Sequence, residues 1–398
     1  MKLKTKKTLS VPGFVAGGMA CGIKKNGKPD LALIVSETPA TAAGLFTTNQ
    51  VVSPTVTVTR QHLQAAKSVR AIVANSGNAN ACTGPSGDRA CRDMVVLTAK
   101  QLGVTERDVL VASTGVIGVP FPLAPVEKGL PQLAGNLVAN GWDDAARAIL
   151  TTDLVIKTAC VEYGGVTVGG ITKGSGMIHP NMATMLAFVG TNLKIGKADL
   201  KAALKVANEY TFNRINVDGD TSTNDMILVL ANGQAGNAPV KKGTQAFKEF
   251  VAALTEVCRS LAFQIVKDGE GATKFVTVGV KGAKTEKQAL RVSRAVADSK
   301  LVQTALFGED PNWGRIIAAV GYAGVPLKPE KIDIAFNGTP LVKNGAPVAG
   351  LSVAALHKQM KAKDLRIDIG LNLGRASAET YTCDLSYDYV RINAEYTT

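Results

Sequence analysis

Apolar positions follow two patterns along the chain, short continuous or alternating runs and longer runs with helical spacing. The short runs are rich in Val, Ile, Leu and Thr and predict strands at residues 31–35, 55–58, 71–74, 109–112, 185–189, 226–230, 275–280, 332–336 and 365–369, with an alternating final strand near the C-terminus. The run at 161–171 alternates and is rich in glycine, which predicts a twisted strand or a hairpin. Helical spacing predicts helices at residues 89–102, 141–150, 197–208, 244–266, 288–307 and 351–361. Strands and helices therefore mix throughout the chain, as in an α/β protein.

The segment KGSGMIHPNMATML at residues 173–186 interrupts this pattern. Its two glycines and its proline predict an irregular turn, and the buried strand that follows starts at Thr184. If the turn presses the Ala183 carbonyl against the Thr184 hydroxyl, an N-to-O acyl shift followed by ester hydrolysis would cut the chain between them. The new α-amino group, with a pKa of about 7.7–8.0, would then act as the base for the hydroxyl of its own residue. A core strand that happens to begin with threonine accounts for the same pattern.

Seven motifs resemble, in the same order, those of one enzyme family. They are NSGNANACTG at 75–84, STGVIG at 113–118, the segment at 173–186, DGDTSTND at 218–225, DGEGATK at 268–274, DPNWGR at 310–315 and INAEYTT at 392–398. The family is that of the ornithine acetyltransferases, the bifunctional glutamate N-acetyltransferases (ArgJ proteins) of arginine biosynthesis. The resemblance implies an αββα sandwich similar to that of N-terminal-nucleophile enzymes. It also implies self-cleavage into an alpha chain, 1–183, and a beta chain, 184–398, with a smaller C-terminal α/β portion from about residue 281. Both chains contribute strands, so we expect them to stay together, and the family implies an α2β2 assembly.

The same resemblance implies a reaction. Enzymes of this family transfer the acetyl group of N2-acetyl-L-ornithine to L-glutamate in a ping-pong reaction through an acetyl-threonine ester, which here would form on Thr184. No cofactor takes part covalently. Family members differ in whether acetyl-CoA can also donate the acetyl group.

Residues that match the family's site positions occur in both predicted chains. Thr114 and Gly115 match its oxyanion hole, and they follow a predicted strand in a turn where small residues let donors approach an oxyanion. An ordinary strand-ending turn also accounts for them. The substrate-binding matches are one of Thr151 and Thr152, which the spacing does not distinguish, together with Lys173, Thr184, Glu270, Asn393 and Thr398. By charge, Lys173 suits the carboxylate of a substrate and Glu270 suits the amino group of ornithine. The alternatives are a solvent-facing lysine and an exposed acid in a helix-ending loop.

The motif at 218–225 superficially resembles a calcium loop. Its sixth position is Thr223 rather than glycine and its twelfth is Val229 rather than a bidentate acid, so we expect no calcium site. Its short polar side chains predict instead a hydrogen-bonded network behind Thr184. His179 precedes a proline in a turn and is not a candidate catalytic residue.

The composition narrows the remaining function classes. A net charge of +13 favours anionic ligands, but the basic residues are spread over the chain and aromatic residues make up only 5%, unlike a nucleic-acid-binding surface. Six dispersed cysteines and three dispersed histidines predict neither disulfides nor a metal site. No apolar run approaches the roughly 20 residues that cross a bilayer, and the lysine-rich start is broken by Pro12 and glycines, unlike a signal peptide. We therefore expect a cytoplasmic enzyme that binds neither membranes nor nucleic acid.

Two other functions remain open from the sequence. An amidase or aminopeptidase of the related N-terminal-nucleophile fold would use water in place of glutamate and release acetate. A non-catalytic basic binding protein would keep an intact chain and form no acyl-enzyme.

Overall fold

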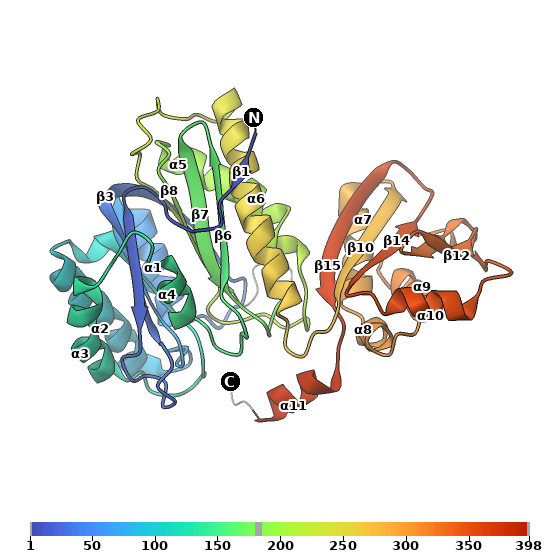
Figure 1. The fold of residues 1–398 in the computed structure, drawn as a ribbon, viewed down its shortest axis with the longest axis horizontal. Helices are drawn as coiled ribbons and strands as arrows, with labels where there is room; N and C mark the ends of the chain where they lie inside the picture. The colour runs from blue at the N-terminus through green and yellow to red at the C-terminus, as the bar shows by residue number, and fades with distance from the viewer. Residues whose placement is uncertain (1, 180–184, 396–398) are drawn as a thin grey trace. The chain divides into compact units, whose positions relative to one another are not determined.

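A computed structural model describes residues 2–179 and 185–395, and the chain divides into two units (Figure 1). Of the described residues, the first unit contains the chain up to Asn213 together with Asp220–Ile265, and the second contains Arg214–Gly219 and residues 266–395. No described helix combines the length and the apolar character that a membrane span requires.

The first unit is built on one long strand, β3 (Leu31–Phe46), which takes part in two sheets. A register shift between Val35 and Ala40 separates its two parts. The first sheet consists of β2 (Phe14–Met19), the first part of β3, β4 (Val69–Asn75) and β5 (Val109–Ser113). The second sheet runs in the order β1 (Lys4–Thr5), β6 (Lys157–Tyr163), β7 (Val166–Lys173), β8 (Leu186–Thr191), β9 (Met226–Ala231) and the last part of β3.

Alternate side chains along these strands enter different cores. In the first sheet, Ile34, Ile72 and Leu110 belong to the cluster that also contains Phe188 and Leu228 of the second sheet. Their sequence neighbours face the other way and pack against α2 (Gly84–Leu102) and α3 (Leu123–Gly135). This period of two places one core between the sheets and another beneath the outer helices. Within the inner core, α4 (Trp142–Ala148) contributes the fully buried Trp142.

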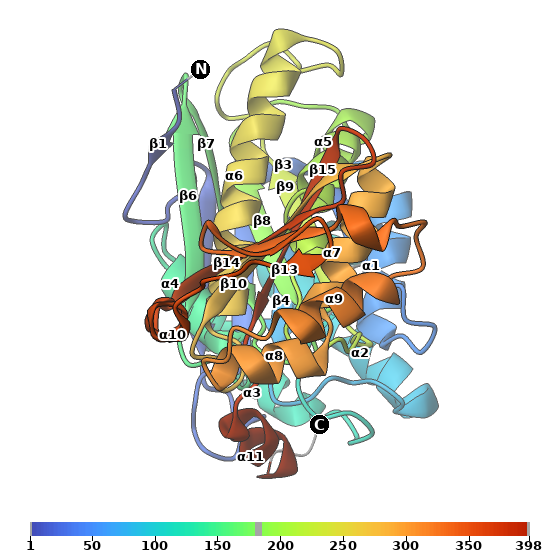
Figure 2. The ribbon, with the colours of Figure 1, turned by 90° about the vertical axis from the view of Figure 1, so that its right-hand side faces the viewer.

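The second sheet is covered on its other face by α5 (Lys197–Glu209) and α6 (Gln245–Lys267), and Figure 2 shows α6 in front of β8. The side chain of Gln264 on α6 ties this helix to β6, because it donates to the Thr158 carbonyl at 3.1 Å and accepts from the Thr158 amide at 3.3 Å. The expected αββα sandwich is therefore confirmed. The expected hairpin at 161–171 is also present, as β6 and β7 joined at Gly164 and Gly165, both with positive φ.

The strand predicted at 55–58 is wrong, because these residues lie in helix α1 (Pro54–Ala65). The Ser53 side chain caps this helix by accepting from the Thr55 amide, and Pro54 occupies the first turn, where its missing N–H costs nothing. Of the Thr and Val residues that suggested a strand, Thr55, Val56 and Val58 lie on the buried face of the helix, and Thr57 is exposed. Packing and capping outweigh their weak β preference.

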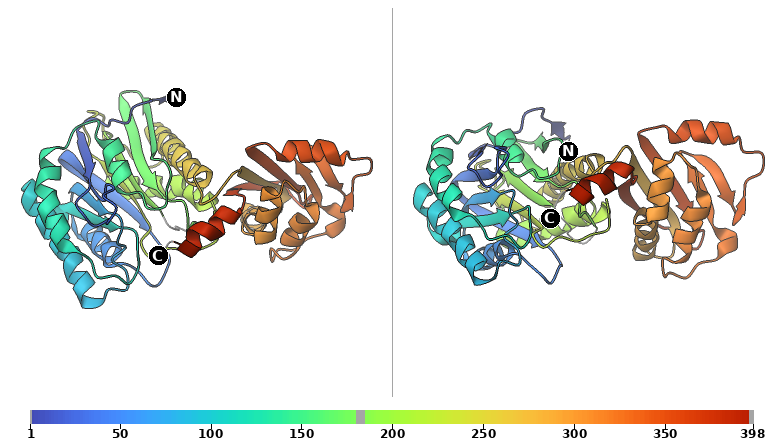
Figure 3. Two further views of the ribbon diagram at one scale, coloured as in Figure 1. Left: turned by 60° about the horizontal axis from the view of Figure 1, so that its bottom comes forward. Right: turned by 90° about the horizontal axis from the view of Figure 1, so that it is seen from below.

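The second unit contains one mixed sheet, in which β10 (Phe275–Ala283) pairs in parallel with β14 (Asp364–Gly370) and antiparallel with β15 (Ala376–Cys383). The sheet continues from β14 to β11 (Asp333–Phe336), β12 (Thr339–Lys343) and β13 (Ala346–Pro347). Its helices are α7 (Glu286–Ala297), α8 (Lys300–Phe307), α9 (Trp313–Gly321), α10 (Val353–Met360) and α11 (Tyr387–Glu395), visible from two sides in Figure 3. The sequence placed the start of a C-terminal portion at about residue 281, and in the structure the unit takes in all of β10.

Two elements of the second unit differ from the sequence prediction. The single helix expected at 288–307 is wrong, because α7 ends at Ala297 and the Ser299 side chain caps a new helix by accepting from the Val302 amide. Serine at this position competes with the helix interior for the backbone and favours a new start. In addition, α11 follows the expected final strand, β15, and was not predicted.

Candidate active site

The turn at Thr114 and Gly115, here called the donor turn, follows directly after β5. The Thr114 amide donates to the Asn75 carbonyl at 3.0 Å. Gly115 has a φ of +128°, and a Cβ on it would lie 2.4 Å from the carbonyl carbon of Gly77, so only glycine fits here without a shift of the backbone. Among the described residues, the Thr114 hydroxyl and the Gly115 amide have no hydrogen-bond partner. The turn therefore carries two donors that are not used by the described part of the fold.

Within the polar motif at 218–225, residues 222–225 are buried and hydrogen-bonded. The predicted place of the network behind Thr184 lies outside the described residues. The Asn224 side chain donates to the Ser113 carbonyl at 2.8 Å and to the Ala79 carbonyl at 2.7 Å. The next side chain, Asp225, accepts from the Met185 amide through Oδ1 at 2.8 Å. Two consecutive side chains therefore fix the residue before the donor turn and the residue after Thr184.

The candidate nucleophile Thr184, the preceding Ala183 and the C-terminal Thr398 lie outside the described residues. The strands on either side of the 174–185 connection are nevertheless in fixed register, because Lys173 at the end of β7 is the cross-strand partner of Leu186 at the start of β8. Lys173 therefore lies on the strand next to the one that begins just after Thr184.

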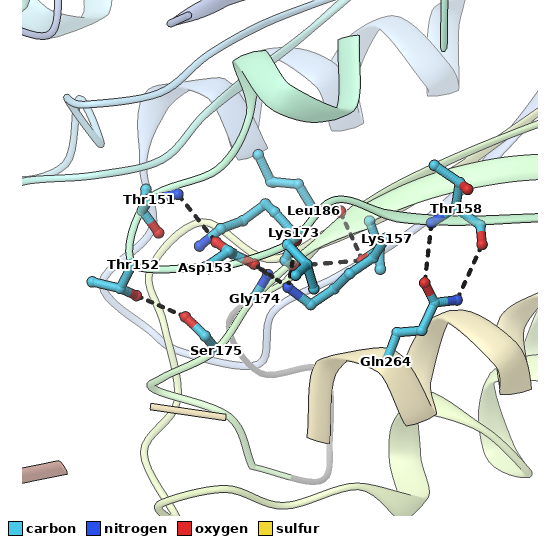
Figure 4. A network of polar contacts seen from close by, with 12 residues as sticks. Thr151, Thr152, Asp153, Lys157, Thr158, Lys173, Gly174, Ser175, Leu186 and Gln264 are labelled. Atoms are coloured by element: carbon cyan, nitrogen blue, oxygen red, sulfur yellow. Dashed lines mark hydrogen bonds and ion pairs between the residues drawn. The ribbon is translucent and has the colours of Figure 1, made fainter. Parts of the chain in front are cut away.

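A buried ion pair lies beside Lys173 (Figure 4). Asp153 Oδ1 accepts from Lys157 Nζ at 2.7 Å and from the Gly174 amide at 2.7 Å, and Asp153 Oδ2 accepts from the Thr151 amide at 3.1 Å. Both side chains of the ion pair are 0% exposed, and Lys173 is 3% exposed. Burial alone would raise the pKa of Asp153, but the charges of Lys173 and Lys157 and the hydrogen bonds hold this pKa at about 2. One ionised carboxylate thus faces two lysines, which leaves the region positively charged.

Thr151 and Thr152 differ in what they contact. Thr151 contributes its main-chain amide to Asp153, whereas the Thr152 hydroxyl lies 2.7 Å from the Ser175 hydroxyl. Both therefore adjoin the segment that starts at Lys173, and Figure 4 shows them on the same side of the ion pair.

In the second unit, the structure brings Glu270 and Asn393 together. Asn393 Nδ2 donates to Glu270 Oε2 at 2.7 Å and to the Tyr389 carbonyl at 3.0 Å. The loop that carries Glu270 also contacts the segment leading into α11, because the Ser386 hydroxyl donates to the Gly271 carbonyl at 2.6 Å. Two candidates that are far apart in the sequence are thus direct partners. The other described candidates, Thr114, Gly115, Thr151, Thr152 and Lys173, belong to the first unit.

Sequence reasoning missed three buried polar groups of this region. Asn224 was predicted only as part of the polar motif at 218–225, and neither Asp153 nor Lys157 was singled out. The spacing of Asp153 and Lys157 was the available signal, because a buried acid needs a nearby base. Only the structure shows that both are fully buried.

An αββα sandwich that buries hydrogen-bond donors and paired charges at the ends of its strands has the features of an α/β enzyme. The model of the ArgJ family matches residues 15–398, and the chain belongs to this family. The expectation from the seven motifs is therefore confirmed, and the chain is an enzyme. A non-catalytic binding protein does not fit this membership.

Curated relatives match along nearly the whole chain. The arginine biosynthesis bifunctional protein ArgJ of Symbiobacterium thermophilum is 47% identical over 392 residues, with 97% of each chain covered. The protein of the same name from Geobacter sulfurreducens is 46% identical over 394 residues, covering 98% of this chain and 100% of the relative. A crystal structure of the arginine biosynthesis bifunctional protein ArgJ from Bacillus halodurans is 43% identical, has a TM-score of 0.52, and covers 54% of this chain and 100% of that chain.

Proposed function

We propose that this enzyme transfers the acetyl group of N2-acetyl-L-ornithine to L-glutamate after cutting its own chain between Ala183 and Thr184. The Thr184 hydroxyl attacks the acetyl carbonyl, the free amine of the same residue takes the proton, and ornithine leaves from an acetyl-threonine ester. Glutamate then attacks this ester and leaves as N-acetylglutamate. The donor turn stabilises the oxyanion in both steps.

The observation that carries this proposal is the link through Asn224 and Asp225. These neighbouring side chains hold the Ser113 carbonyl and the Met185 amide at 2.8 Å each. The donor turn begins one residue after Ser113, and Thr184 lies one residue before Met185. A nucleophile and its oxyanion donors must keep a fixed separation, and a short buried link of this kind would provide it.

The solved relative supports the scission. Its chain is matched in full by 54% of this chain, and residues 184–398 make up the same share of the sequence. A relative whose crystallised chain has the length of the proposed beta chain is expected if ArgJ proteins are cut at this point.

The charged candidate residues each suit one group of the substrates. Lys173, in a buried region with excess positive charge, would pair with a substrate carboxylate. Glu270, held by Asn393 at 2.7 Å, would pair with the amino group of ornithine. Thr398 is proposed as a further substrate contact because it matches the family's site position. We further propose that two cleaved units form an α2β2 assembly. We also propose that acetyl-CoA can serve as a second acetyl donor and that the reaction uses no other cofactor.

Intact mass spectrometry of the purified protein, with and without N-acetylornithine, tests the proposal. We expect two chains, and an added acetyl group on the chain that starts at Thr184. Thr184→Ala should remain one uncut, inactive chain, while Thr184→Ser, which keeps a hydroxyl, should still be cut. An uncut parent protein with full acetyl-transfer activity would refute the mechanism. Acetate release in place of N-acetylglutamate formation would identify an amidase instead.

A further inference from the structure

The loop at residues 21–30 is fixed beside the donor turn by one buried carboxylate. Asp30 accepts from the amides of Cys21 at 2.6 Å, Gly22 at 3.2 Å and Lys24 at 2.8 Å. Its own carbonyl accepts from the Ser76 amide at 2.9 Å. Asp30 is fully buried, so the position of this loop relative to Ser76 is set by the fold rather than by solvent.

The side chain of Lys24 extends from this loop across the candidate site. A Cβ on Gly77 would lie 2.8 Å from Lys24 Cγ, so the stem of the lysine packs on Gly77. Gly77 is also the residue that forces glycine at Gly115, because its carbonyl carbon would lie 2.4 Å from a Cβ there. The stem of Lys24 therefore lies directly behind the donor turn.

The other end of Lys24 holds the candidate substrate segment. Its Nζ donates to the Leu150 carbonyl at 2.7 Å and to the Pro29 carbonyl at 2.8 Å. Leu150 immediately precedes Thr151, whose amide binds Asp153 at 3.1 Å. One side chain thus connects the donor turn with the segment 151–153, which the sequence separates by about 35 residues.

The charge of the half-buried Lys24 interacts with those of the buried side chains of Lys173 and Asp153. The pKa of Lys24 is lowered to about 8, chiefly by burial and in part by the nearby charges of Lys173 and Lys28, while the charges of Asp30 and Asp153 oppose the shift. The side chain therefore carries its charge below this pH and loses it above. Each proposed substrate, N-acetylornithine or glutamate, brings an α-carboxylate to this region.

We propose that Lys24 is a positioning residue for acetyl transfer: it holds the segment 151–153 in place relative to the donor turn and adds its positive charge to that of Lys173 for the substrate α-carboxylate. This inference rests on the function proposed above. It assigns a role to a lysine that lies in a stretch of exposed basic residues and that the sequence does not distinguish from its neighbours.

Lys24→Met tests the inference, because methionine keeps an apolar stem on Gly77 and removes the ammonium group. We expect complete scission at Ala183, a KM for N-acetylornithine raised about tenfold or more, and a smaller change in kcat, since a lost charge–carboxylate contact is worth roughly a factor of ten or more. Lys25→Met, at the exposed neighbouring position, should match the parent in both constants.

The pH dependence of KM separates this role from a purely structural one. In the parent, KM for N-acetylornithine should rise as the pH increases through about 8, where Lys24 loses its proton, and in Lys24→Met it should stay flat over the same range. Lys24→Arg should restore a low KM and move its rise to higher pH. If Lys24→Met fails to fold, Lys24→Gln, which retains a donor for Leu150 without the charge, should show the raised, flat KM.

The two proposals fail in different ways. A parent protein that forms no acetyl-enzyme and no N-acetylglutamate refutes the proposed function. A parent that transfers acetyl groups, together with a Lys24→Met variant that has the parent's KM and pH dependence, refutes only the role of Lys24.

Discussion

Replacing Asp153 with asparagine tests whether the buried ion pair holds the segment around Lys173. The change keeps the shape of the side chain but removes its charge, and it leaves Lys157 fully buried without its ion-pair partner. An amide group also presents a donor where the carboxylate accepted from Lys157 and from the Gly174 amide. The variant therefore loses a charge and a set of accepted hydrogen bonds together.

The size of the effect follows from the pKa of Asp153. Its value of about 2, against 3.8 for an ordinary aspartate, corresponds to about 2–3 kcal/mol, since one pH unit is worth about 1.4 kcal/mol. The buried charge of Lys157, which loses its ion pair with Asp153, adds to this loss, and removing one member of a buried pair costs about 3–5 kcal/mol in all. Because the folded pKa lies below the unfolded one, this stabilisation is complete above pH 3.8 and is lost as the pH falls towards 2.

Denaturant unfolding followed by the fluorescence of Trp142 gives the measurement. Trp142 is fully buried in the inner core of the first unit, and the only other tryptophan, Trp313, lies in the second, so Trp313→Phe makes the signal specific. A Thr184→Ala background keeps scission from differing between variants. We expect Asp153→Asn to lower the free energy of unfolding by about 3–5 kcal/mol, and the double variant Asp153→Asn with Lys157→Met to recover most of it.

The exposed pair of Asp144 and Arg147 provides the matched control. Its side chains are 58% and 51% exposed, and a surface pair of this kind contributes at most about 1 kcal/mol. If Asp153→Asn costs no more than Asp144→Asn, the buried pair does not hold the segment, and the reasoning is wrong. A difference from the parent that stays constant from pH 6 down to pH 3 would refute the linkage to the Asp153 carboxyl.

Two further predictions concern the donor turn and the C-terminus. Gly115→Ala should lower kcat/KM at least about 100-fold, because a Cβ at 2.4 Å from the Gly77 carbonyl carbon must shift the donors. Gly118→Ala is the control, because Gly118 also has a positive φ but a Cβ there would meet no atom within 4 Å. This variant should lose about 1–2 kcal/mol of stability and keep most of its activity. Equal activity of the two variants in a steady-state assay would contradict the role of the turn. Deleting Tyr396, Thr397 and Thr398 should abolish acetyl transfer and leave the Trp142 fluorescence unchanged, because the segment serves the site rather than the core. Full turnover of the truncated protein would rule out a role for Thr398.

The buried strands were predictable because their sequences leave few alternatives. Residues 109–112 and 226–231 are continuous apolar runs that are buried on both faces, and such runs of four to six residues fit strands better than helices. The interval at 55–58 has a similar composition, yet Ser53 and Pro54 start a helix there. The break between α7 and α8 likewise depends on one serine side chain. A single capping residue decides where a helix begins, whereas a periodic pattern is read over many residues and does not detect that one residue.

The candidate site was predictable only where a motif marks it. The resemblance pointed to Glu270 and Asn393 separately, and the structure shows them bonded at 2.7 Å. Nothing in the sequence pairs Lys24 with the Leu150 carbonyl, because the two are brought together by strands and helices between them. The role of a lysine in a basic stretch depends on how far its Nζ is buried in the folded protein, and the amino-acid composition does not show this.

The order of strands in the second sheet has a consequence for a protein cut before β8. Strands β8 and β9 come from the later part of the chain, yet they are inserted between β7 and β3 of the earlier part, with backbone ladders on both sides. The two chains of such a molecule cannot separate by breaking one edge of the sheet, because the hydrogen bonds of both the β7–β8 and the β9–β3 ladders would have to break at once. On a native column the cut enzyme should elute as one species, and it should resolve into two bands only after the sheet itself has been melted by detergent or urea.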